Sequence, residues 1–129
     1  MSGVPLLSVL AVGAGAAVGA LLRWVLAVRF NPLWPALPLG TLIANLAGGY
    51  AIGLVLGWLA QHPELPAELR LFLVTGLLGG LTTFSTFSAE VVAHLHDGRL
   101  LPALLVAGTH LAGSLLLTAL GFATARALS

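Results

Sequence analysis

Two polar stripes in this apolar sequence carry side chains that could hold or pass a polar solute. Thr41 and Asn45 are four residues apart, and Ser114 lies midway between His110 and Thr118 at the same spacing. Residues four apart lie close together on one face of a helix. Each stripe therefore predicts a row of hydroxyl, amide or imidazole groups along a single helix face.

These stripes allow more than one interpretation. An asparagine inside a bilayer is costly unless it is paired or wet, so Asn45 either bonds to a neighbouring helix or donates into a pore. Ser114 and Thr118 could bond to carbonyls of their own helix, although an aligned polar row is more typical of a cavity or a helix contact. His110 adds an ionisable group, which could act at membrane depth or sit neutral in a vestibule.

The most informative stretch runs from Gly76 to Ser88. It holds three glycines in five residues and then a run of Thr, Ser and Phe, which is poor helix-forming material. We therefore predict a helix break, which a membrane tolerates only where the backbone is buried in protein or lines a water-filled cavity. Carbonyls freed by a break can hold hard cations. The ring edges of Phe84 and Phe87 carry partial positive charge that can face an anion.

Composition indicates which elements position these residues. Hydrophobic residues make up 59% of the chain and charged residues 7%, whereas about 25% of a typical soluble domain is charged. Lipid must therefore solvate much of the surface, and a spanning helix takes about 20 apolar residues. We predict an all-α membrane protein with a single transmembrane domain over residues 1–129. Its four transmembrane helices cover approximately residues 6–28, 39–60, 69–95 and 100–125, with the third broken mid-membrane.

Other features argue against several classes of function. Four spans use the length of this sequence, so we expect no soluble catalytic domain and no enzyme. The net charge of +1 suggests no nucleic-acid partner, and the absence of cysteine excludes disulfides and thiolate chemistry. The first ten residues carry no Lys or Arg, so we expect the first apolar segment to be retained as a helix.

Glycines at helical spacing predict tight packing of the spans. Small residues four apart let helix backbones approach closely where lipid removes the hydrophobic drive for association. The glycines with this spacing are Gly15 and Gly19 in the first span, and Gly49, Gly53 and Gly57 in the second.

The stretch Gly79–Ser88, which reads GGLTTFSTFS, resembles the signature of the Fluc/CrcB family of fluoride channels. The resemblance extends along essentially the whole chain, and the motif in the third span is highly specific. The other spans carry, in order, Gly15–Ala16 through Arg23–Trp24, then Gly40–Asn45 with Gly48 and Gly49, and then Gly113–Leu115, each similar to a family motif.

This resemblance implies an antiparallel, dual-topology homodimer with two pores and a structural sodium ion where the two broken helices cross. Carried over by motif, the sodium ligands are the backbone carbonyls of Gly79 and Thr82 of each subunit. Arg23 matches a motif arginine, although snorkelling to the membrane interface also explains it. The implied fluoride pathway is lined by Asn45, Phe84, Phe87, Ser85, Thr86, Ser114 and Thr41.

The implied function is a fluoride-selective passive channel in the cell inner membrane that exports fluoride and lowers its toxicity in the cytoplasm. Fluoride is strongly hydrated, and neutral donors can replace its water without the fixed cation that would trap the ion. A rival function is a small four-helix, dual-topology exporter of organic cations, which needs a carboxylate deep in a span. Glu90 lies near the end of the third span and the other acidic residues lie outside the spans, which argues against this rival. A non-conducting assembly subunit is a second rival, but it leaves the polar stripes unexplained.

Dual topology also follows from the positive charges, because the chain has five arginines and no lysine. With four spans, Arg70 and Arg126 lie on one side of the membrane and Arg29 and Arg99 on the other. Arg23 is close to the second group. A balance of two against two, or two against three, gives the insertion machinery little bias under the positive-inside rule.

Overall fold

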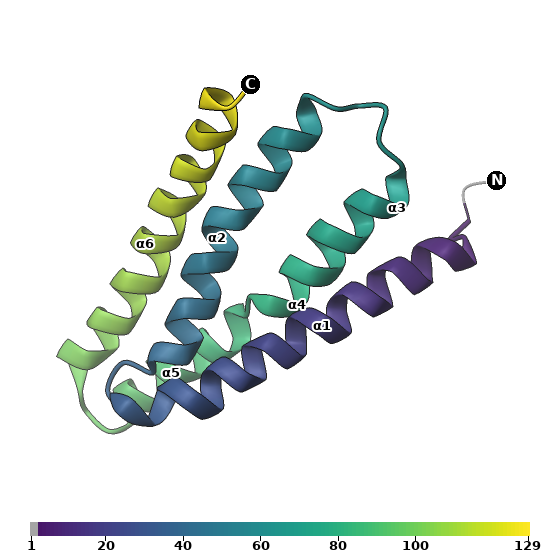
Figure 1. Cartoon of the computed structure of the whole chain (residues 1–129). Coiled ribbons are helices and arrows are strands. Elements are labelled where there is room, and N and C mark those ends of the chain that lie inside the picture. Colours follow the sequence, from purple (N-terminus) through teal and green to yellow (C-terminus); the bar gives the residue numbers. More distant parts are fainter. Residues whose placement is uncertain (1–2) are drawn as a thin grey trace.

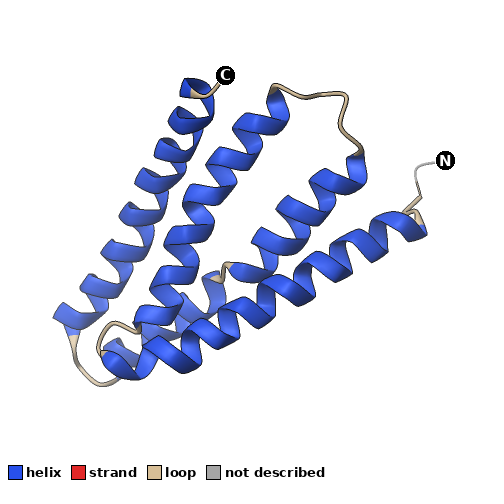
Figure 2. Ribbon diagram, viewed as in Figure 1, coloured by secondary structure: helices blue, strands red, loops and turns tan. Residues whose placement is uncertain are grey.

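The computed structural model describes residues 3–129, and all regular secondary structure in that range is helical (Figure 2). Met1 and Ser2, the first two residues of the predicted domain, lie outside the described residues. Four helical segments are long and apolar enough to cross a membrane, which confirms the prediction of an all-α protein with four spans. These segments are Leu6–Leu33, Leu39–Ala60, Ala67–His96 and Leu100–Ala127.

Three of these segments have no interruption within the span. The first comprises α1 (Leu6–Phe30) and the short 3₁₀ helix η1 (Asn31–Leu33), and it ends in a proline-rich corner. The second is α2 (Leu39–Ala60) and the fourth is α6 (Leu100–Ala127). A tight turn precedes α6, where Gly98 adopts a φ of 69°, a left-handed conformation that glycine enters without a steric penalty.

The third segment is composite. It consists of α3 (Ala67–Arg70), the π-helix η2 (Leu71–Leu78), α4 (Gly79–Leu81) and α5 (Phe84–His96). Thr82 and Thr83 interrupt the helix, because both have extended backbones, with φ and ψ of −87° and 155° for Thr82 and −148° and 114° for Thr83. The interruption covers only these two residues, and the glycines that motivated its prediction are helical.

Those glycines allow α1 to approach the third segment closely. A Cβ added to Gly76 would lie 3.0 Å from the Cα of Gly15, and one added to Gly80 would lie 2.6 Å from the carbonyl oxygen of Ala16. A Cβ on Gly19 would collide with the backbone of Leu77. Backbone therefore packs on backbone along this contact, as the glycine spacing in the first span predicts.

The glycines of α2 serve the same purpose against α6, which runs beside α2 along most of its length (Figure 1). A Cβ on Gly53 would collide with the carbonyl of Thr118, and a Cβ on Gly49 would lie 3.2 Å from the carbonyl oxygen of Ser114. The approach is close enough for the Thr118 hydroxyl to donate to the Gly49 carbonyl oxygen at 2.9 Å.

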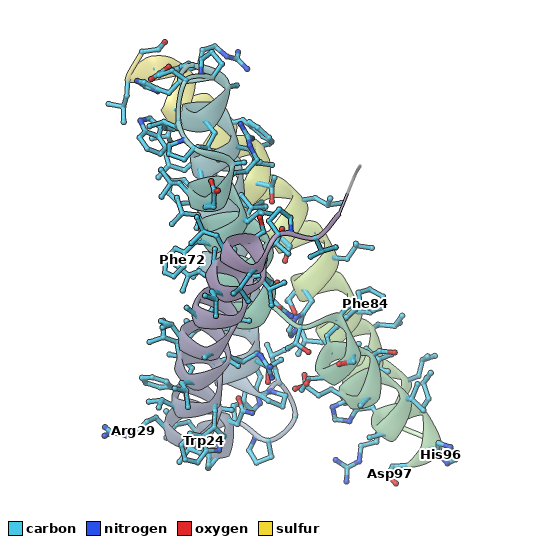
Figure 3. All side chains as sticks on the ribbon, turned by 90° about the vertical axis from the view of Figure 1, so that its right-hand side faces the viewer. Trp24, Arg29, Phe72, Phe84, His96 and Asp97 are labelled. Atoms are coloured by element: carbon cyan, nitrogen blue, oxygen red, sulfur yellow. The ribbon has the colours of Figure 1, made fainter. Side chains whose placement is uncertain are left out.

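The two halves of the third segment have different neighbours. The part before the interruption packs against α1, whereas α5 packs against α6. Seen from the side, the far end of α5, with His96 and Asp97, lies away from the end of α1, with Trp24 and Arg29 (Figure 3). The start of α1, the C-terminus and the α2–α3 connection lie at the opposite end of the molecule (Figure 1). The interruption thus lies where the third segment changes partners.

Candidate functional site

A groove of about 370 Å³ lies beside the interruption, between α2, the third segment and α6. It brings together most of the residues that the sequence singles out. Neither Lys nor Arg lines it. The predicted pathway and sodium residues that line it are Asn45, Gly79, Thr82, Phe84, Phe87 and Ser114.

Asn45 holds the interruption in place through its amide group. Its Oδ1 accepts from the N–H of Thr83 at 2.7 Å, and its Nδ2 donates to the Thr83 carbonyl oxygen at 3.0 Å. The same Nδ2 lies 2.9 Å from Nδ1 of His110. The interhelical hydrogen bond that the sequence left open for Asn45 is therefore present, and Asn45 also lines the groove.

Thr83 starts the new helix after the interruption. Its Oγ1 accepts from the N–H of Thr86 at 3.1 Å and is the N-cap of α5. Its hydroxyl also donates to the Oγ1 of Thr86 at 3.1 Å. A threonine N-cap satisfies one of the N–H groups that the first turn of a helix leaves without partners.

These side chains replace the backbone hydrogen bonds that a continuous helix would form. In such a helix the carbonyls of Gly79 and Thr82 would accept from the N–H groups four residues on, those of Thr83 and Thr86. Asn45 binds the first of those N–H groups and Thr83 binds the second. The two carbonyls are thereby released from their helical partners, and Gly79 is exposed on the surface of the chain.

Arg23 contacts a third carbonyl of this stretch. Its Nε donates to the carbonyl oxygen of Gly80 at 3.0 Å, which joins α1 to the residue preceding the end of α4. Snorkelling to the membrane interface is thus an incomplete explanation for this side chain, because it has a specific acceptor within the protein.

The aromatic rings form a short row at the groove. The rings of Phe84 and Phe87 meet edge to face, with centroids 5.3 Å apart and an interplanar angle of 74°. Phe87 stacks in turn on His110, at 4.8 Å and 23°. Phe84 is 76% exposed in the single chain. Its ring is therefore accessible for contact with a molecule outside this chain.

Behind the row, His110 faces Glu90. His110 is 3% exposed, and its Nε2 lies 3.9 Å from Oε1 of Glu90. That distance is too long for a hydrogen bond. Glu90 also lines a second cavity of about 250 Å³ near the α5–α6 turn, together with His94, Asp97 and Arg99. The His110–Glu90 pair therefore separates this cavity from the groove.

Three predicted pathway residues lie outside the groove lining. Thr41 is buried, and both its backbone N–H and its hydroxyl bond to Asn31, at 3.0 and 3.2 Å. Ser85 is exposed, with its hydroxyl 3.3 Å from that of Thr83, while the Thr86 hydroxyl accepts from the same threonine. Within the second stripe, Thr118 bonds to α2 rather than to its own helix.

Thr83 and Glu90 were missing from the predicted site residues. A signal for Thr83 was present, since a threonine before a run that resumes helix is a common N-cap. Glu90 was placed near an aqueous helix end, but six residues of α5 follow it and its carboxyl group faces a buried histidine. Its carboxyl group therefore lies within α5 and faces the protein interior rather than an aqueous helix end.

The fold and the groove together define a multi-pass membrane protein with a groove of polar groups and aromatic rings between its helices. The protein-family model described as "CrcB-like protein, Camphor Resistance (CrcB)" matches residues 10–122. The chain belongs to this family, as the motif in the third span indicated.

Several similar proteins carry a name that states their function. One from Thiobacillus denitrificans is 66% identical over 113 residues, which cover 88% of this chain and 91% of that protein. One from Bordetella avium is 63% identical, over 90% of each chain, and one from Pseudomonas putida is 57% identical, over 91% of this chain and 92% of its own. All three are named "Fluoride-specific ion channel FluC". They give no support to an exporter of organic cations.

Proposed function

We propose that this chain is a fluoride-selective passive channel, a conducting rather than a catalytic protein. One observation carries the proposal: a groove of neutral donors and ring edges at a helix interruption, in a chain 57–66% identical to fluoride-specific channels. A strongly hydrated ion must exchange its water for close donors, yet leave again. Hydroxyls, an amide and ring edges meet both demands, because each offers only partial positive charge.

Conduction through this chain is driven by the ion gradient and the membrane voltage. An interior-negative potential favours the exit of an anion by about 2.3 kcal/mol per 100 mV. A passive channel in the cell inner membrane therefore clears fluoride from the cytoplasm and limits its toxicity.

The direct test is anion efflux from proteoliposomes that contain only this protein. Fluoride efflux that greatly exceeds chloride efflux supports the proposal. Equal rates for both anions contradict selectivity, and no efflux of either anion would identify a non-conducting assembly subunit. Transport of an organic cation driven by a proton gradient would instead favour the exporter, in which Glu90 would exchange the proton.

The rings of Phe84 and Phe87 contribute to the proposed pathway through their positive edges. Phe84→Ile or Phe87→Ile keeps an apolar side chain but removes the ring edge, and Phe87→Ile also removes the stacking on His110. We expect each variant to lower fluoride efflux by up to about tenfold, since ring-edge contacts are worth up to about 1.5 kcal/mol and a barrier increase of about 1.4 kcal/mol slows a rate tenfold. The assay is the same proteoliposome efflux.

Phe30→Ile is the matched control, because Phe30 ends α1 and does not line the groove. Its efflux should equal that of the unmodified chain. Unchanged efflux from both groove variants would assign the rings to packing alone.

A second copy of the chain completes the proposed pore. Polar groups of Asn45 and Ser114 line the groove, while Phe84 and Leu115 beside them are 76% and 64% exposed. Lipid cannot satisfy polar groups at membrane depth, so protein must cover a groove of this kind. The family resemblance supports an antiparallel partner, which would place the interruptions of the two subunits together around a two-fold axis.

The proposed sodium ion fits the donor set at this place. The carbonyls of Gly79 and Thr82 are released from helical partners, and neutral backbone oxygens suit a hard monovalent cation. Among residues 3–129 no group of three or more His, Asp or Glu side chains could hold a metal ion. With the mid-membrane interruption of each subunit at the dimer centre, four carbonyls would surround the ion.

Sodium should therefore stabilise the dimer, and Thr83 should contribute to that effect. Replacing sodium with a large organic cation is expected to lower the midpoint of thermal unfolding in detergent. Thr83→Val removes the N-cap of α5 and costs about 1 kcal/mol, and it leaves the N–H of Thr86 without its side-chain acceptor beside the Thr82 carbonyl. We expect this variant to unfold earlier and to respond less to sodium.

Thr83→Ser is the control, because serine keeps the accepting hydroxyl. A midpoint that is independent of sodium in the unmodified chain would contradict the structural cation.

A further inference from the structure

The orientation of the Asn45 amide is fixed by the backbone of Thr83. The N–H of Thr83 needs an acceptor, which only Oδ1 can provide, and the Thr83 carbonyl needs a donor, which only Nδ2 can provide. The two bonds, at 2.7 and 3.0 Å, form a two-point contact that a flipped amide would replace with two repulsions. One hydrogen of Nδ2 is thereby used, and the second points toward His110.

This orientation also fixes the state of the His110 ring. Because Nδ2 of Asn45 can only donate, Nδ1 of His110 at 2.9 Å must accept and carries no proton. The neutral ring then holds its proton on Nε2, which faces Glu90 at 3.9 Å. Phe87 stacks on the ring and, with the burial of His110 to 3% exposure, limits its rotation.

The geometry points to His110 as an internal acceptor that competes with fluoride for the second amide hydrogen of Asn45. This inference rests on the proposed function and assigns a role to a histidine that the sequence left open. Fluoride at Asn45 must take over a hydrogen bond that the protein already uses. The contact to His110 is a single bond, whereas displacing Thr83 would break a paired one, so His110 is the partner that exchanges.

Such an exchange keeps the fluoride site weak enough for conduction. A buried N–H without an acceptor is unfavourable, and an ion that satisfied it would be held strongly. When Nδ1 of His110 satisfies this hydrogen in the absence of the ion, binding replaces one hydrogen bond with another. The ion then gains little and can leave again, which a conducting site requires.

Variants of His110 separate this role from a packing role. His110→Leu removes the acceptor and leaves the Asn45 hydrogen free for fluoride. We expect the half-saturating fluoride concentration for efflux to fall by about tenfold, together with a lower maximal rate. His110→Asn places Oδ1 at the position of Nδ1 and should restore both quantities toward those of the unmodified chain.

Other outcomes of this experiment overturn the inference. If His110→Leu lowers the maximal rate without lowering the half-saturating concentration, His110 serves packing alone. If His110→Asn behaves like His110→Leu, the acceptor at Nδ1 is irrelevant. If the unmodified chain conducts no fluoride at all, the proposed function fails, and a second measurement then decides the hydrogen bond by itself.

That second measurement is ¹⁵N nuclear magnetic resonance of histidine-labelled protein in lipid, with the His110→Asn spectrum subtracted to identify His110. We expect an unprotonated, hydrogen-bonded Nδ1 without fluoride, and a shift of its resonance when sodium fluoride is added. A proton on Nδ1 overturns the assigned hydrogen bond. A resonance that does not respond to fluoride concentrations that support efflux overturns the competition.

Discussion

Asn45→Asp should abolish fluoride conduction, with efflux from proteoliposomes at least about hundredfold below that of the unmodified chain. The substitution puts a carboxyl oxygen where Nδ2 lies, 3.0 Å from the Thr83 carbonyl oxygen and 2.9 Å from Nδ1 of His110. The contact with the Thr83 carbonyl oxygen becomes repulsive when the acid is ionised, the amide hydrogen available to an anion is lost, and the new negative charge opposes an anion beside it. A combined increase of about 3 kcal/mol in the barrier accounts for the hundredfold loss.

Protonation of the new acid does not rescue the variant. A protonated carboxyl group offers one hydrogen, whereas the amide of Asn45 supplies two, one to Thr83 and one to His110. A protonated acid that donates to the Thr83 carbonyl therefore has no hydrogen left for an anion. Efflux should therefore stay low across the pH range in which the protein is folded.

Asn31→Asp is a matched control, because Asn31 is the other asparagine of the chain. Its Oδ1 accepts from the N–H of Thr41, and its Nδ2 donates to the hydroxyl of Thr41. An aspartate can accept from both groups, because a hydroxyl can reverse its direction. This control should fold and conduct. Normal efflux from Asn45→Asp would remove Asn45 from the pathway.

The four spans were predictable because they depend on short-range properties of the sequence. Runs of apolar residues between proline and glycine turns set their number, and α2 has the bounds that those turns indicated. The glycine spacing likewise predicted close packing, since a missing side chain matters only where another backbone approaches. Gly15 and Gly53 both meet backbone at the positions where a Cβ would lie.

The position of the helix break was predicted less accurately than its existence. Low helix propensity at Gly79 and Gly80 suggested that the glycines themselves would be irregular, but both are helical, and Gly80 packs against the backbone of α1. Two threonines form the interruption, since partners outside the helix bind the N–H groups of Thr83 and Thr86. Such a partner as Asn45, on another helix, cannot be identified from local propensity.

The pairing of Asn45 with His110 shows the same limit. Each stripe was visible as a polar row on its own helix, and either row could have faced a cavity or a neighbour. Which residues meet depends on how α2 and α6 are positioned along each other, and this follows from the fit of Gly49 and Gly53 against α6. Packing of the smallest residues thus decides which polar groups meet.

A second prediction with a large expected effect concerns the orientation of the chain in the membrane, which depends on the distribution of the arginines. Arg70, at the end of α3, and Arg126, in the last turn of α6, lie toward the end that holds the start of α1 and the C-terminus. Arg29, in the last turn of α1, and Arg99, which precedes α6, lie at the other end. The positive charges at the two ends are nearly balanced, so the positive-inside rule gives little preference. Both orientations should therefore coexist, as an antiparallel pair requires.

Shifting that balance should remove most of the fluoride efflux. Two lysines added after Ser129 should bias the chain one way, and His96→Lys with Asp97→Lys, in the exposed α5–α6 turn, should bias it the other way. Each biased chain alone lacks an opposite copy, so its groove stays unpaired and conduction is lost. Co-expression of the two supplies both orientations and should restore efflux, whereas two glutamines after Ser129 should change nothing.

A compartment-sensitive reporter fused to the C-terminus counts the two orientations directly. If the C-terminus of the unmodified chain is found on only one side of the membrane, this result contradicts the antiparallel dimer together with its shared cation site.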